Sequence, residues 1–213
     1  MGNDKLDKHL LEWLQENKNR SFKSPRESKF KTQTQNFKIM IISKSNIVII
    51  GMPGSGKSTI GNILSEMMNF SFLDCDDHIE QMEGMTLQQI IDEKGVAEFK
   101  KIEQARIMEL NVKNCVIAPG GSIVYYSKAV NHLKKSSIFI FLNVSFSELE
   151  SRLKNAPTRG IVGLKKKSFN QLFNERLPLY LKCADIIIDC SGKSKHQIAE
   201  EVYQRLADKL VHD

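Results

Sequence analysis

The stretch NIVIIGMPGSGKST, residues 46–59, decides the fold. It opens with a short β-branched apolar run, as buried parallel strands do. It closes with the pattern G-x-x-x-x-G-K-[ST], matched at Gly51, Gly56, Lys57 and Ser58. Glycines let the backbone turn its N–H groups around phosphate oxygens, and the following helix points its N-terminus at the same phosphates. The stretch therefore predicts a P-loop that binds a nucleoside triphosphate.

Each residue type in this loop suits one part of a nucleotide. A lysine reaches the β- and γ-phosphates, and a hydroxyl at the next position can hold Mg²⁺. The residues expected to contact the nucleotide are Gly51, Gly54, Ser55, Gly56, Lys57, Ser58 and Thr59. The loop alone does not fix the reaction, because GTPases, motor ATPases and small-molecule kinases share it. The chain has no Asn-Lys-x-Asp guanine motif, and its size fits a compact kinase.

Strand-like and helical patterns alternate along the rest of the chain. This alternation predicts an α/β fold, a parallel sheet with helices on both faces. The expected strands are 46–51, 70–74, 115–119, 137–142 and 184–189. The expected helices are 57–68, 76–83, 86–94, 96–112, 126–134, 145–154, 168–182 and 194–210.

Length, charge and cysteine content limit the kinds of protein that this chain can be. The 213 residues suit one domain with a tail, and the net charge is +6. Residues 1–45 hold ten Lys or Arg but only five Asp or Glu, so the basic character belongs mostly to this segment. Nucleic acid is therefore not an expected partner of the domain. No apolar run reaches membrane-spanning length, no signal-peptide pattern opens the chain, and the four cysteines form no CxxC pair. We expect a cytoplasmic protein, with a monomer favoured.

The chain divides into two parts. Residues 1–45 read as a basic, partly helical N-terminal extension, and residues 46–213 as the P-loop kinase domain. Within the extension, apolar residues recur at helical spacing over 4–17. Residues 18–38 are polar and poor in aliphatic side chains, which is typical of a flexible tether.

Two carboxylates follow the second predicted strand. Asp74 ends that strand, where open α/β sheets place their ligands, and Asp76 stands two residues on. In an extended segment the two side chains share one face. One could hold Mg²⁺ through water, while the other accepts a hydrogen bond from a substrate hydroxyl and takes its proton. The alternative is simple capping of the next helix.

Two further segments carry polar groups that suit an anionic acceptor. APGGSIV, 118–124, can present backbone N–H groups as an anion pocket, or it is a plain strand-to-helix turn. EFKKIEQAR, 98–106, places Lys100 and Glu103 three residues apart. They either form a surface salt bridge, or Lys100 meets an acidic group on the acceptor.

The segment NAPTRGIVGLKKKSF, 155–169, reads as a lid over about 155–167. A linker is the alternative by composition. Its place between two helices at the phosphate end favours a lid, with Gly160 and Gly163 making it mobile. Arg159 is its one guanidinium and suits bidentate phosphate contact.

Taken together, these motifs resemble the shikimate kinase family. The likeness covers about 46–190 and rests on GMPGSGKST, LDCDDHIE, EFKKIE, APGGSIV, the PTRG segment and ERLPLYLKCADIIID. The resemblance implies a nucleoside-monophosphate-kinase type of fold with five parallel strands in the order 2-3-1-4-5. It also implies phosphorylation of the 3-hydroxyl of shikimate by ATP with Mg²⁺.

The resemblance also implies a role for each matched residue. The catalytic residues would be Lys57, Asp76 and Arg159, and the metal would be held by Ser58 and Asp74. Arg152 would stack on adenine, and Arg159 would contact phosphate and substrate. The acceptor would be bound by Asp76, Lys100, Gly120, Gly121 and Arg176, the last pairing with the carboxylate.

Several positions depart from the family's pattern. Lys100 stands where the family has arginine, and it loses the planar two-donor fork. Ser122 replaces a glycine, and Gly160 a proline. Gly95–Val96 replaces a Gly–Glu pair, and a proline is absent near 191–193. These changes leave open a related kinase for another hydroxy compound such as gluconate or homoserine. The basic charge of the extension leaves open an alternative of another class, a nucleotide-gated binding protein that uses it.

Overall fold

The computed structural model of the chain describes residues 44–154 and 167–212. The predicted helix 4–17, the predicted tether, all of the predicted lid except Lys167, and Arg159 with it lie outside the described residues. Their predicted roles therefore stay predictions.

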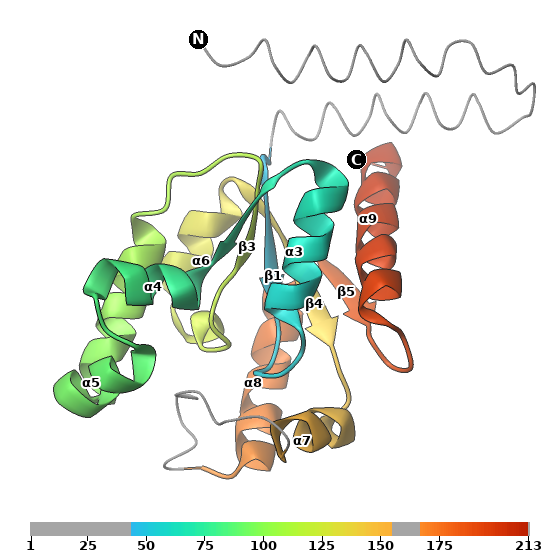
Figure 1. Ribbon diagram of the computed structural model, residues 1–213. Helices are drawn as coiled ribbons and strands as arrows, with labels where there is room; N and C mark the ends of the chain where they lie inside the picture. Colours follow the sequence, from blue (N-terminus) through green and yellow to red (C-terminus); the bar gives the residue numbers. More distant parts are fainter. Residues whose placement is uncertain (1–43, 155–166, 213) are drawn as a thin grey trace, which may run out of the picture.

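A five-stranded sheet forms the centre of the molecule (Figure 1). Its order is β2-β3-β1-β4-β5, and every strand pairing is parallel, which confirms the predicted fold. The central strand, β1, pairs with β3 through Ile47 opposite Val116 and with β4 through Ile47 opposite Ile138. The strands are β1 Asn46–Ile50, β2 Ser71–Asp74, β3 Cys115–Ala118, β4 Ser137–Asn143 and β5 Ile186–Asp189.

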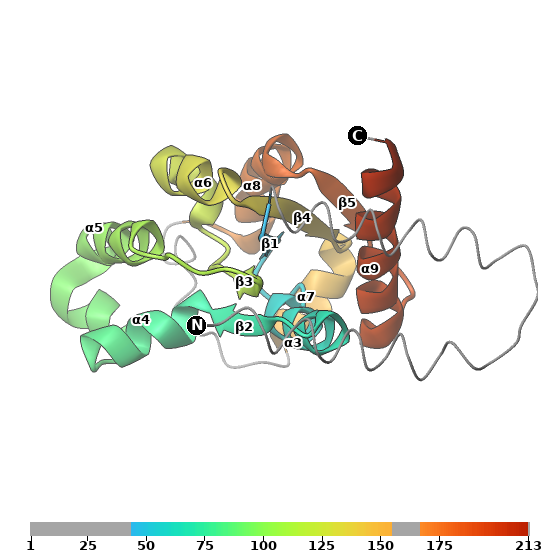
Figure 2. The same ribbon diagram turned by 90° about the horizontal axis from the view of Figure 1, so that it is seen from above.

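Helices cover both faces of the sheet, as the alternating pattern predicts (Figures 1 and 2). One face carries α3 and α9, which pack against each other, and the other carries α6 and α8, which both contact β4. The helices on the sheet are α3 Lys57–Met68, α6 Ser127–Lys134, α8 Phe169–Cys183 and α9 Lys195–His212. The remaining ones are α4 Cys75–Glu83, α5 Leu87–Met108, α7 Phe146–Lys154 and the short 3₁₀ turn η1 Ile123–Tyr125.

The helices α4 and α5 stand beside the β2 edge and have a small core of their own (Figure 1). Its buried residues are Ile79, Ile90, Ile91 and Phe99. The two helices predicted on either side of Gly95 form one element, α5, which is interrupted at Gly95 by non-helical backbone with φ 80°. Glycine reaches this φ without strain, so the break falls where the sequence has Gly95–Val96.

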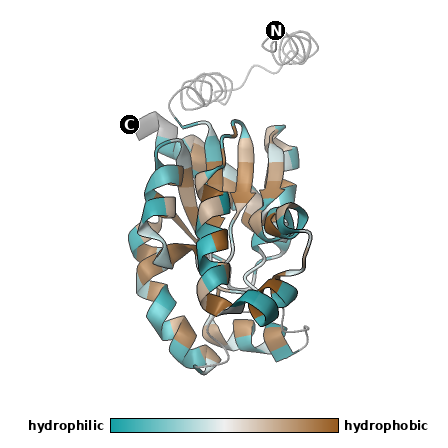
Figure 3. Cartoon of the chain, turned by 90° about the vertical axis from the view of Figure 1, so that its left-hand side faces the viewer, coloured by the Kyte–Doolittle hydropathy of each residue, from teal (hydrophilic) through white to brown (hydrophobic). Residues whose placement is uncertain are grey.

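The main core lies between the sheet and its helices. The β1 residues Ile47, Val48, Ile49 and Ile50 are almost completely buried, as expected of a central parallel strand. The helices in Figure 3 carry both brown and teal residues, in keeping with one face on the sheet and one in water. Among the residues that the structure describes, no helix is both long enough and apolar enough to cross a bilayer.

Candidate functional site

The predicted nucleotide loop joins β1 to α3 at the carboxyl end of the sheet. Gly56 is the N-cap of α3, with φ 95°, and it offers no side-chain cap to the first helical turn. The backbone N–H groups of that turn, from Lys57 to Thr59, are therefore directed at whatever occupies the loop. Within the described residues, the buried Ser55 hydroxyl also has no hydrogen-bond partner. These features fit an anionic ligand such as a polyphosphate.

The Lys57 side chain turns back toward the loop, and its ammonium group bonds to loop carbonyls. Its Nζ donates to the carbonyl oxygens of Gly51 and Met52, each at 3.2 Å. Burial lowers the pKa of Lys57, while the nearby carboxylates of Asp76 and Asp74 act in the opposite direction. The side chain therefore lies between the loop and the acidic pair, where it can contact a phosphate from the acceptor side.

Asp74 joins the loop to the acidic segment. Its Oδ2 accepts a hydrogen bond from Ser58 Oγ at 2.5 Å. Its Oδ1 accepts from the backbone N–H of Asp76 at 2.9 Å and so caps α4. Both readings of Asp74 are thus compatible, because one carboxylate oxygen caps a helix while the other sits beside the predicted Mg²⁺ hydroxyl. A hydroxyl and a carboxylate are hard oxygen donors of the kind that Mg²⁺ prefers.

The carboxyl group of Asp76 is less acidic than an ordinary aspartate. Its pKa is raised to about 7, mainly by burial, with Lys57 opposing this and Asp74 and Glu103 adding to it. A carboxylate with a pKa near neutral accepts a proton more readily than an ordinary one. The basicity of Asp76 therefore suits removal of a proton from a hydroxyl.

Glu103 is a buried carboxylate in the site, which corrects the alternative of a surface salt bridge with Lys100. Its exposed fraction is 1%. It accepts hydrogen bonds from Ser122 Oγ at 2.6 and 2.7 Å and from Tyr126 OH at 2.6 Å. Burial raises the pKa of Glu103, and these donors partly oppose that effect. Ser122, which departs from the family's glycine, therefore contributes a donor to this buried carboxylate.

The two glycines after β3 lie against acidic and basic side chains. A Cβ on Gly120 would lie 2.6 Å from Glu103 Oε1 and 3.1 Å from Asp76 Oδ1. A Cβ on Gly121 would lie 3.1 Å from Arg176 Nη1. The Gly-Gly turn therefore passes between the carboxylates and the buried guanidinium, with no room for side chains.

Arg176 and Lys100 approach this turn from α8 and α5. Arg176 is 1% exposed, and its guanidinium carbon lies 5.2 Å from the centre of the Tyr125 ring. The Lys100 Nζ lies 5.9 Å from the same ring. The two predicted acceptor cations are thus gathered at one aromatic side chain, which sequence reasoning did not single out.

Arg152 lies beside the nucleotide loop. Its guanidinium donates to Gly54 O at 2.9 Å and to Glu148 Oε1 at 2.6 Å. Its predicted stacking on adenine stays a prediction.

The loop after β5 is held by hydrogen bonds to Asp189. Its Oδ1 accepts from the backbone N–H of Ser191 at 3.0 Å and from Ser191 Oγ at 2.7 Å. These bonds order the turn that lacks the family's proline.

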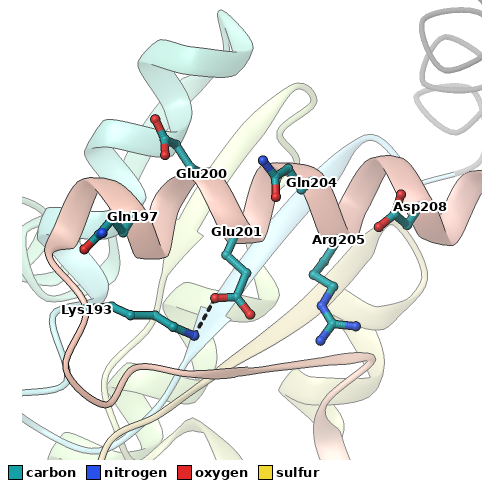
Figure 4. A pocket seen from close by; sticks show the side chains of 7 residues that line it. All are labelled: Lys193, Gln197, Glu200, Glu201, Gln204, Arg205 and Asp208. Atoms are coloured by element: carbon teal, nitrogen blue, oxygen red, sulfur yellow. Dashed lines mark hydrogen bonds and ion pairs between the residues drawn. The ribbon is translucent and has the colours of Figure 1, made fainter. Parts of the chain in front are cut away.

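A separate polar hollow runs along α9 (Figure 4). It is crossed by an ion pair between Lys193 and Glu201 at 2.6 Å. Its lining residues, none of them predicted for the site, are Lys193, Gln197, Glu200, Glu201, Gln204, Arg205 and Asp208. The convergent groups at the carboxyl end of the sheet, rather than this hollow, are the candidate active site.

Comparison with known proteins decides the family. The family model described as "Shikimate kinase" matches residues 53–207. The chain belongs to the shikimate kinase family. Curated shikimate kinases of Sulfurihydrogenibium sp. and Persephonella marina are each 35% identical over 162 residues, which cover 76% of this chain and 97% and 98% of those proteins.

Solved structures give the same result. A shikimate kinase from Acinetobacter baumannii in complex with shikimate has a TM-score of 0.71 at 27% identity, over 81% of this chain and 98% of that one. The shikimate kinase of Aquifex aeolicus has a TM-score of 0.67 at 30% identity, over 79% and 99% of the two chains. A thymidylate kinase from Candida albicans shares the fold at 16% identity and a TM-score of 0.52. The shikimate kinase family uses ATP as its phosphate donor.

Proposed function

We propose that this chain transfers the γ-phosphoryl group of ATP to the 3-hydroxyl of shikimate, with Mg²⁺ as cofactor. One observation carries the proposal: Asp76, Glu103 and Arg176 converge on the Gly120–Gly121 turn, next to the nucleotide loop. This arrangement offers carboxylates to hydroxyls and a guanidinium to a carboxylate. Shikimate carries both kinds of group, and membership of the shikimate kinase family supports the assignment.

The phosphate-side residues would neutralise charge. Lys57 exchanges its bonds to loop carbonyls for contacts with the β- and γ-phosphates, and the first turn of α3 donates backbone N–H groups to them. Ser58 and Asp74 would hold the magnesium ion, which would neutralise phosphate charge when bound. Arg152 and Arg159 would complete the nucleotide site.

The acceptor-side residues would orient the hydroxyl. Asp76 accepts a hydrogen bond from the 3-hydroxyl and takes its proton as the new P–O bond forms. The Gly120 and Gly121 backbone and Lys100 would line the pocket, while Arg176 pairs with the carboxylate. Positioning and charge neutralisation would supply most of the catalysis in such a transfer.

An acceptor panel tests the proposal against its nearest rival. ATP consumption is coupled to NADH oxidation with shikimate, gluconate or homoserine as the acceptor. We expect turnover with shikimate and at most background rates with the other two. Turnover of gluconate or homoserine without turnover of shikimate would assign the chain to a related kinase.

A nucleotide-gated binding protein is the rival from another class. The basic charge of residues 1–45 motivates it, but the convergent Asp76 and Arg176 are not required for mere binding. We propose instead that the domain 46–213 carries the activity by itself in the cytoplasm, as a monomer. Removal of residues 1–39 should leave kcat/KM for shikimate within twofold. Nucleotide-dependent RNA or DNA binding that requires those residues would favour the rival.

A further inference from the structure

Tyr125 lies beside both cations that are assigned to the acceptor, Arg176 and Lys100. It ends the 3₁₀ turn η1, directly after the Gly-Gly turn, and its side chain is half-buried. The Tyr125 hydroxyl accepts a hydrogen bond from Arg176 Nε at 3.3 Å and donates one to Glu175 Oε1 at 3.1 Å. The hydroxyl is therefore used in both directions, as acceptor toward the guanidinium and as donor toward the carboxylate.

The Tyr125 ring acts on the same cations as its hydroxyl. The Arg176 guanidinium carbon lies 5.2 Å and the Lys100 Nζ 5.9 Å from the ring centre, both within cation–π range. The negative face of the ring thus lowers the cost of gathering two positive side chains in one pocket. Lysine has no planar fork to orient it, so a ring that attracts Lys100 matters more here than it would with arginine.

The contact involves one edge of the guanidinium only. Tyr125 engages Nε, whereas Nη1 lies on the side of Gly121, 3.1 Å from where a Cβ would stand. Glu175, which holds the other side of the hydroxyl, also forms an ion pair with Lys167. Arg176 therefore reaches the Gly-Gly turn with its Nε bonded to Tyr125, while Tyr180 also hydrogen-bonds its side chain.

We propose that Tyr125 is a positioning and specificity residue that orients Arg176 and Lys100 for the carboxylate of the acceptor. The inference rests on the proposed function, since it assumes that the acceptor carries a carboxylate. It predicts that loss of the hydroxyl weakens recognition of that carboxylate and leaves the phosphate side intact.

The test is Tyr125→Phe in the full-length chain, which keeps the ring and removes the hydroxyl. We expect KM for shikimate to rise roughly fivefold to tenfold, with kcat and KM for ATP within twofold. The matched control is Tyr203→Phe on α9, outside the site, which should change none of these values. A thermal melt of each variant checks that the fold is kept.

A neutral acceptor separates positioning from a merely structural role. The carboxamide of shikimate lacks the charge that Arg176 would bind, so Tyr125→Phe should alter its dissociation constant, measured by calorimetry with ADP present, less than twofold. The same variant should weaken binding of shikimate itself by the factor seen in KM. An equal loss for both ligands, or no loss for shikimate, would overturn the inference. Absence of shikimate turnover in the unmodified protein would instead refute the proposed function.

Discussion

The Oγ of Ser58 lies 2.5 Å from Oδ2 of Asp74, so the nucleotide loop and the acidic segment are joined by one hydrogen bond. The other oxygen of Asp74 caps α4 by accepting from Asp76 N at 2.9 Å. One side chain thereby ties the predicted magnesium site to the helix that carries the predicted base. A conservative substitution at Asp74 should therefore weaken Mg²⁺ binding without unfolding α4.

Asp74→Asn tests this division of labour. Asparagine still caps a helix, but its uncharged amide holds Mg²⁺ poorly. We expect the Mg²⁺ concentration that gives half-maximal activity to rise by about tenfold or more, with little change in melting temperature. Asp77→Asn, the same change in the exposed first turn of α4, is the control and should leave the Mg²⁺ dependence unaltered. Equal shifts in the two variants would show a general charge effect.

Asp76→Asn should separate chemistry from nucleotide binding. The variant cannot take a proton from the acceptor, so kcat should fall at least about a hundredfold. The dissociation constant for ATP should stay within about twofold, since Asp76 lies on the acceptor side of Lys57. Rapid-quench kinetics and calorimetry measure the two quantities. A parallel loss of ATP affinity would contradict the role assigned to Asp76.

The raised pKa of Asp76 also predicts a pH dependence of stability. The folded carboxyl has a pKa of about 7, above its value of 3.8 in the unfolded chain, so between these values the folded state binds more protons. The free energy of unfolding of the ligand-free protein should therefore fall as pH rises from about 4 to 7, by at most ~4 kcal/mol from this group. Urea titrations of Asp76→Asn should show a shallower slope and greater stability at pH 8. Superimposable pH profiles would rule out this contribution.

Lys100→Arg tests the departure from the family's carboxylate clamp. A guanidinium offers two parallel donors to a carboxylate, where an ammonium offers a point charge. With Lys100 and Arg176 both close to the Tyr125 ring, we expect KM for shikimate to fall several-fold in steady-state assays, with kcat nearly unchanged. Loss of activity in this variant would mean that the pocket is built for a different anion.

Much of the fold could be predicted from the sequence because its signals are local. The β-branched run 46–50 and the glycine-rich loop after it define β1 and the start of α3, and the alternation of elements gives a parallel sheet. The predicted boundary between helices 86–94 and 96–112 falls at Gly95, where a φ of 80° interrupts α5. The strand order itself came from the resemblance rather than from periodicity.

The parts of the site that were missed depend on tertiary contacts. The i, i+3 spacing of Lys100 and Glu103 looks like a surface pair, but the turn after β3 brings Ser122 and Tyr126 over Glu103 and buries it. In the sequence Tyr125 is an ordinary aromatic residue, because its contact with Arg176 depends on the packing of α8. An unusual serine in a glycine-rich turn, followed by two adjacent tyrosines, was the available signal.

The most direct test of the account is ³¹P NMR of the product formed from ATP, Mg²⁺ and shikimate by the purified protein. We predict one new phosphomonoester signal, coupled to the proton on carbon 3 of shikimate, that grows as ATP is consumed. No new phosphomonoester, or a phosphate on a different hydroxyl, would contradict the proposed function and the placement of Asp76 beside the 3-hydroxyl.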